Sequence, residues 1–176
     1  MAAVDADDLK RAIERVFALN QRYYDLIDAG LPHALAPPAD AVQIEELERT
    51  LGGRLPPSYR LFLSFHDGWK HWEGDMHLLS VAEQQVGPYA EWIRDWKLSA
   101  WDEGDAVILE GAVIGARLGA SRGLVLDTRK RDDRGEMEIV NWSQREIARY
   151  ADFLELLEQT ARDLEAIIAE EAAEQG

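Results

Sequence analysis

The 176-residue chain carries a formal net charge of −15 and contains no cysteine. The absence of thiols excludes disulfides, thiolate zinc sites and cysteine nucleophiles, and it fits a reducing compartment. The charge argues against nucleic acid and anionic membranes as partners and favours a basic protein, although acidity also serves solubility alone.

The first predicted element is a long amphipathic helix from Asp5 to about Ala29. Asp5 is a suitable N-cap, and apolar residues recur every three or four positions after it. No signal-peptide pattern and no apolar run of about 20 residues is present, so we expect a cytoplasmic protein without a membrane segment. We expect residues 1–39, the helix and a proline-containing link, to pack onto a domain of residues 40–176 that ends in an acidic helix.

A helix hairpin is predicted over residues 44–68. Asp40 and Gln43 have the spacing of a capping box at its start. Gly52 suits a left-handed C-cap, and Pro57 suits the first position of the second helix. The apolar residues of both helices fall on one face, which indicates a packing role.

The rest of the chain is predicted to be mainly sheet. Residues 69–74 are interpreted as a polar aromatic loop, and residues 82–100 are ambiguous because Gly87-Pro88 interrupts any single helix. The predicted strands are residues 76–81, 106–109, 112–118, 123–128 and 137–142. A final helix is predicted from Ser143 or later to about Ala172, and Ser143 has capping-box spacing to Glu146. The predicted elements are helices, followed by a meander of strands and a final helix, and this order indicates an α+β fold.

The hairpin has an ordered signature: a helix that ends in Leu-Gly, a Leu-Pro restart, and a second helix with an aromatic residue and Phe-Leu. These positions are Ile44, Glu48, Leu51-Gly52, Leu55-Pro56, Tyr59, Phe62-Leu63 and Gly68-Trp69. Matching stretches continue at Leu78–Glu83, Ile114-Gly115, Gly123–Asp127, Ile147-Ala148 and Phe153-Leu154. The set resembles the SUKH superfamily, the Smi/Knr-type domain of a fungal cell-wall assembly regulator and of many bacterial toxin-immunity proteins.

The resemblance implies a curved antiparallel sheet of about four to six strands, flanked by N-terminal and C-terminal helices. It also implies protein binding, since many bacterial members are thought to neutralise secreted toxins, often nucleases. It spans about residues 44–157 and leaves the N-terminal helix unexplained. The matched positions are structural, so the resemblance assigns no functional residue.

Histidines and carboxylates crowd together after the hairpin. They are His66, Asp67, His71, Glu73, Asp75 and His77. Their spacing matches no zinc pattern, and Gly68 should end the helix before His66 and His71 can share a face. We expect ordinary polar residues here, with no metal or cofactor and no catalytic residue. A metal-dependent hydrolase is the least favoured alternative.

Two tryptophans lie among these carboxylates. Trp69 and Trp72 either pack internally or anchor a partner, because a tryptophan ringed by acidic residues suits a binding hot spot that faces Arg or Lys. The candidate partner-binding residues are Asp67, Trp69, Trp72, Glu73, Asp75, Asp102, Glu103 and Asp105.

The favoured function is that of a non-enzymatic immunity protein whose acidic face fills the basic cleft of a toxin such as a nuclease. The alternative is a regulatory scaffold that binds several partners through its terminal helices. The partner and the oligomeric state are open.

Overall fold

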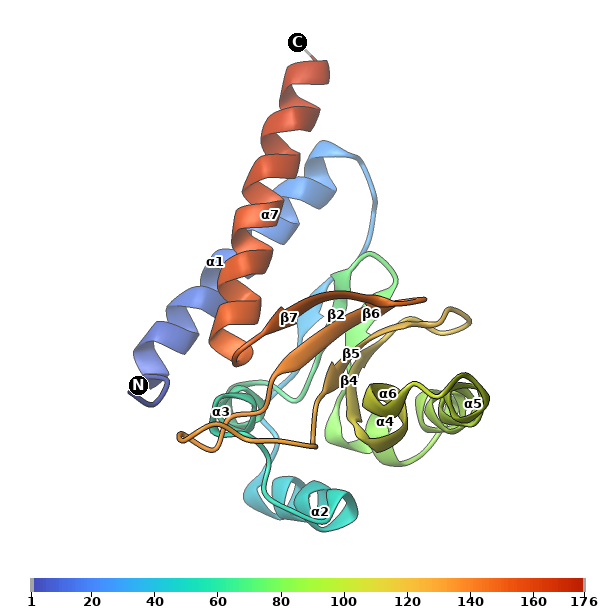
Figure 1. Cartoon of the computed structure of the whole chain (residues 1–176). Helices are drawn as coiled ribbons and strands as arrows, with labels where there is room; N and C mark the ends of the chain where they lie inside the picture. Colours follow the sequence, from blue (N-terminus) through green and yellow to red (C-terminus); the bar gives the residue numbers. More distant parts are fainter. Residues whose placement is uncertain (1, 176) are drawn as a thin grey trace.

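Seven strands form one antiparallel sheet in the computed structural model, which describes residues 2–175 (Figure 1). The strands are β1 (Ala34–Leu35), β2 (Trp69–Glu73), β3 (Met76–Leu78), β4 (Ala112–Ala116), β5 (Arg122–Leu126), β6 (Ile139–Ser143) and β7 (Glu146–Tyr150). Each strand pairs with the next along the chain, so the sheet is a simple meander. The predicted α+β class is confirmed, and the sheet has more strands than expected.

The helices lie on both faces of this sheet. They are α1 (Ala6–Leu26), α2 (Ala41–Leu51), α3 (Pro57–Phe65), α4 (Val81–Gln85), α5 (Pro88–Glu103), α6 (Ala106–Glu110) and α7 (Phe153–Glu174). In Figure 1, α1 and α7 cross one another on one side of the sheet, and α5 and α6 lie on the other side.

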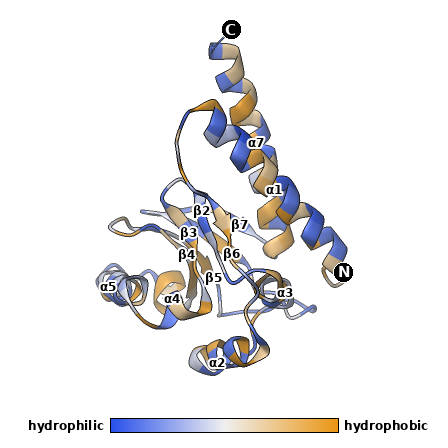
Figure 2. Cartoon of the chain, turned by 180° about the vertical axis from the view of Figure 1, so that it is seen from behind, coloured by the Kyte–Doolittle hydropathy of each residue, from blue (hydrophilic) through white to orange (hydrophobic). Residues whose placement is uncertain are grey.

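Alternating strand residues divide the interior into two cores. Leu124 and Leu126 face a first core shared with α1, α2, α3 and α7, whereas Val125 faces a second core under α5 and α6. Successive side chains of a strand point to opposite faces, which is why neighbouring residues reach different cores. Hydrophobic and hydrophilic residues likewise alternate along α1 and α7 (Figure 2), as helices with one buried face require.

The predicted helix ends are found where the local chemistry requires them. The Asp40 carboxylate and the Gln43 side chain form a complete capping box at α2. Gly52 ends α2 with a left-handed backbone (φ 75°), and Pro57 occupies the first turn of α3. At the hairpin exit, Gly68 (φ 98°) passes so close to β3 that a Cβ would lie 2.8 Å from the Leu78 carbonyl oxygen.

Several predicted elements differ from those in the structure. Residues 106–110 form helix α6 rather than a strand, because the apolar run is bracketed by Asp105 and Gly111 and buries only Val107 and Ile108 in the second core. The final helix, predicted from Ser143 or later, begins at Phe153. Residues 143–150 instead make the β6–β7 turn and strand β7.

The N-terminal helix is part of the main core. Leu9 and Val16 of α1 are completely buried, and Arg15 pairs with Glu165 of α7 at 2.7 Å. Asn20 Nδ2 donates to the Trp72 carbonyl oxygen at 3.0 Å, so α1 is also joined to the sheet. The tertiary structure therefore makes α1 contribute to the stability of the domain.

A buried carboxylate ties the end of β5 to β7. The Asp127 side chain is 3% exposed and accepts hydrogen bonds from Arg129 Nε at 2.8 Å and Arg149 Nη1 at 2.9 Å. The hydrogen bonds from Arg129, supported by Arg149, hold the pKa of Asp127 well below its usual range. The folded state therefore favours the ionised carboxylate.

Replacing Asp127 by asparagine is expected to lower the free energy of unfolding by about 2 kcal/mol at pH 7, because Arg129 loses its carboxylate partner and Arg149 loses one of three. Since the folded-state pKa lies below the unfolded value of about 3.9, this stabilisation is complete above that value and is lost as the pH falls below it. Urea titrations at pH 7 and at pH 3 measure the difference, which should shrink at the lower pH. The exposed Asp133→Asn variant is the matched control, and an equal loss for both variants would contradict the assignment.

Candidate protein-binding surface

The structure buries both tryptophans that were candidate anchors. Trp69 is 1% exposed and Trp72 is 2% exposed, and their rings meet edge to face at 5.0 Å. Residues three apart in a regular strand face opposite sides, but His71 has a left-handed backbone (φ 53°) and the β2–β3 register shifts there. This bulge turns both indoles into the first core. Residues 69–73 are thus a strand with inward side chains, and neither tryptophan is available to a partner.

Three of the candidate carboxylates are occupied within the molecule. Asp67 accepts a hydrogen bond from the Val81 N–H at 2.7 Å at the start of α4, and burial raises its pKa. Glu73 pairs with Arg122, and Asp75 lies 3.6 Å from an Arg117 nitrogen. These carboxylates hold β2 and β3 in place.

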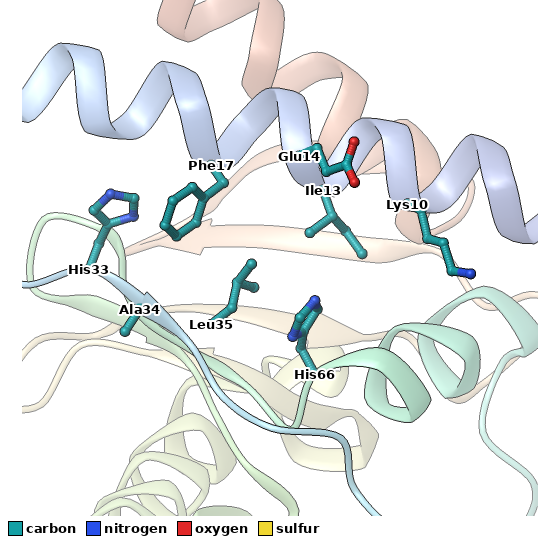
Figure 3. A pocket seen from close by; sticks show the side chains of 8 residues that line it. All are labelled: Lys10, Ile13, Glu14, Phe17, His33, Ala34, Leu35 and His66. Atoms are coloured by element: carbon teal, nitrogen blue, oxygen red, sulfur yellow. The ribbon is translucent and has the colours of Figure 1, made fainter.

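The three histidines of the same stretch do not form one cluster, because His66 lies apart from the other two. His66 lies in a pocket beneath α1, where its Nδ1 is 2.9 Å from the Ala36 carbonyl oxygen and its ring is near Leu35 (Figure 3). His71 Nδ1 instead contacts the Gly74 carbonyl oxygen, and its ring lies 4.6 Å from that of His77. Within residues 2–175, no three His, Asp or Glu side chains are grouped so that they would hold a metal ion.

The remaining candidates lie on or next to α5. The inner side of this helix is attached to the sheet by Trp96 and Ala100, which are buried in the second core, and by the partly buried Trp92. Gly104 ends the helix with a left-handed backbone (φ 75°). Asp105, which is half-buried, then leads into α6.

The opposite side of α5 exposes large apolar side chains. Trp101 is 73% exposed and Leu98 is 69% exposed, and they are three residues apart, so they are neighbours on the helix surface. Exposed charged residues lie beside them: the carboxylates of Glu91, Asp95 and Asp102, and Arg94, which is four residues before Leu98. We call the set the α5 outer surface. Its members are Glu91, Arg94, Asp95, Leu98, Trp101, Asp102 and, at the end of the helix, Glu103.

The carboxylates of the α5 outer surface have no cationic partner. Within the described chain, none of the four forms an ion pair. Lys97 is turned away from them, because its ammonium group donates to the Gly111 carbonyl oxygen at 2.7 Å. Asp102 and Glu103 also lie at the negative end of the helix dipole, where carboxylates are unfavourable. Local stability therefore does not explain this arrangement.

Sequence reasoning named Asp102, Glu103 and Asp105 but missed Leu98 and Trp101. The spacing of the apolar residues in α5 could have separated its buried side from its exposed side. Trp92, Trp96 and Ala100 recur at four-residue spacing and so mark the inner side, which places Leu98 and Trp101 on the outer side.

A sequence profile of the SMI1/KNR4 family (SUKH-1) matches residues 38–170, from just before α2 to near the end of α7. The chain belongs to the SMI1/KNR4 family (SUKH-1). SUKH proteins are commonly immunity proteins, and the family is generally non-catalytic and associated with protein binding. The SUKH-1 match includes the whole of α5 but not α1.

A search of curated proteins found no match to this SUKH-1 protein. Within residues 2–175, none of the helices combines the length and the apolar character needed to cross a membrane.

Proposed function

We propose that this SUKH-1 protein is an immunity protein that binds a basic toxin through the α5 outer surface. The observation that supports it is a largely exposed tryptophan, Trp101, on a helix whose carboxylates form no ion pair within residues 2–175. Exposed tryptophans at protein surfaces are frequent anchors of binding energy. SUKH proteins are commonly immunity proteins, and for this reason we propose a toxin as the partner.

The proposed mechanism is occlusion. Trp101 and Leu98 enter a pocket of the toxin, while Asp95, Asp102 and Glu103 face lysines and arginines that line its cleft. A nuclease is the favoured toxin class, because its substrate is a polyanion and its cleft is therefore basic. The carboxylates would speed the encounter, and the apolar anchor would slow dissociation.

A charge-reversal experiment tests the proposal. The immobilised chain and an Asp95→Lys, Asp102→Lys, Glu103→Lys variant are compared for capture of a basic protein from cells that carry the gene, and the captured protein is assayed with each variant added back. The wild-type chain should abolish the toxin's activity at a one-to-one ratio. The variant should associate at least about 100-fold more slowly, and the wild-type association rate should fall steeply with added salt.

The matched control reverses three exposed carboxylates elsewhere, in the variant Glu45→Lys, Glu46→Lys, Glu170→Lys. This variant has the same net charge as the α5 variant, so it separates local contacts from the overall field of the protein. It should retain inhibition. Equal inhibition by both variants would refute the α5 site, and no inhibition of any captured protein by the wild-type chain would favour the scaffold alternative.

A further inference from the structure

A second cavity lies on the face of the sheet opposite α5. It has a volume of about 740 Å³ and is enclosed by α1, α7 and the ends of β2, β5, β6 and β7. Figure 1 shows α1 and α7 crossing on this side of the sheet. Its size is within the range of small-molecule and side-chain binding sites.

The floor of the cavity contains an amide with an unused acceptor. Asn141 of β6 pairs in register with Leu124 of β5 and with Ala148 of β7, and both of these neighbours pack in or against the first core. Asn141 thus stands where an apolar side chain would continue that core. Its Oδ1 atom is buried and has no hydrogen-bond partner among the described residues. A buried carbonyl group in this state is unfavourable unless a donor reaches it.

Aromatic rings form the walls. Tyr23 and Tyr24 come from α1, and Tyr150 comes from β7. Tyr24 is fixed, because its hydroxyl donates to the His71 carbonyl oxygen and accepts from the Gly74 N–H, each at 2.8 Å. Fixed phenol rings offer flat, electron-rich faces on which a planar cation stacks.

Among the carboxylates that line the cavity, one has no cationic partner within residues 2–175. Glu73 is paired with Arg122 and Asp75 with Arg117, whereas Asp163 of α7 contacts only the Gln159 amide, at 2.7 Å, and no cation within residues 2–175. Burial raises the pKa of the Tyr150 hydroxyl, a hydrogen bond with the Asn141 side chain lowers it, and the nearby carboxylates of Asp163 and Glu73 raise it.

We propose that this cavity binds the side chain of an arginine presented by a peptide or protein ligand. The guanidinium group would donate to Asn141 Oδ1 and to the Asp163 carboxylate while it stacks on a tyrosine ring. Arginine suits this set better than lysine, because its planar fork can serve two acceptors and a ring face at once. The site lies across the sheet from α5, so its test is independent of the proposed function.

The experiment uses the full chain, labelled with ¹⁵N, and titrates it with N-acetyl-arginine-N′-methylamide followed by NMR. The citrulline and lysine analogues are the matched probes. Saturable shifts centred on Asn141 and Tyr150 are expected, with millimolar affinity for arginine and at least about tenfold weaker binding of both analogues. Equal affinity for citrulline, equal affinity for lysine, or shifts centred elsewhere would overturn the proposal.

Two variants locate the contacts. Asp163→Asn, at an exposed position, should weaken arginine binding about tenfold, and Asn141→Leu should weaken it to a similar extent. Glu158→Gln, an exposed change on the same helix outside the cavity, should leave the affinity unaltered. If Asn141→Leu fails to fold, Asp163→Asn still decides the matter, because unchanged arginine binding in that variant would overturn the proposal.

Discussion

Replacing Trp101 by alanine is expected to weaken the complex with the basic toxin by about 100-fold or more, because tryptophan anchors contribute several kcal/mol when they are buried in a partner. The loss should appear mainly as faster dissociation, since the side chain carries no charge and does not steer the encounter. Surface plasmon resonance at constant salt measures both rate constants. The melting temperature of the free variant should stay within about 2 °C of the wild-type value, since Trp101 is 73% exposed.

The matched control for Trp101 is Val42→Ala on α2, where an apolar side chain is 67% exposed at a distant surface. It should bind like the wild-type chain. Trp101→Phe should recover part of the affinity, because the smaller ring fills part of the same pocket. Unchanged dissociation of Trp101→Ala would mean that the toxin contacts another part of the chain.

Deleting residues 2–30 is expected to abolish cooperative unfolding of the remaining chain. The deletion removes Leu9, Ile13 and Val16, all at most 3% exposed in the first core. Loss of one such side chain typically costs about 2–5 kcal/mol, so three exceed or equal the whole stability of an average domain. Circular dichroism during heating measures the transition, and near-ultraviolet signals report whether the tryptophans remain packed.

Removing residues 172–176 is the control, because the last buried residue of α7 is Ile168. This truncation should keep the wild-type transition. A sharp, cooperative transition for residues 31–176 would instead support the description of the N-terminal segment as an addition to an independent domain.

Features set by a few adjacent residues could be predicted from the sequence. The α2–α3 hairpin is an example: the capping box of Asp40, the left-handed Gly52 and the position of Pro57 each depend on local backbone chemistry. The order of elements was also sufficient for the α+β class and the family resemblance.

Features set by distant contacts could not be predicted. Capping-box spacing at Ser143 and Glu146 suggested a helix, but pairing with β6 makes these residues part of a hairpin. The side that Trp72 faces depends on the bulge at His71, which residue spacing does not reveal. The candidate residues divide accordingly: Asp102 and Glu103 lie on α5 and are exposed, whereas Trp69 and Trp72 are buried and cannot anchor a partner.

The inner side of α5 packs on the sheet and its outer side is exposed, and under the proposed function this difference has an evolutionary consequence. The helix is held to the sheet by Trp92, Trp96 and Ala100, so its outward residues carry little of the folding free energy. Exchanges at exposed positions usually alter stability by less than about 0.5 kcal/mol. An inhibitor built in this way can accumulate changes in specificity along one helix, and so keep pace with a diversifying toxin, without first acquiring mutations that restore its fold.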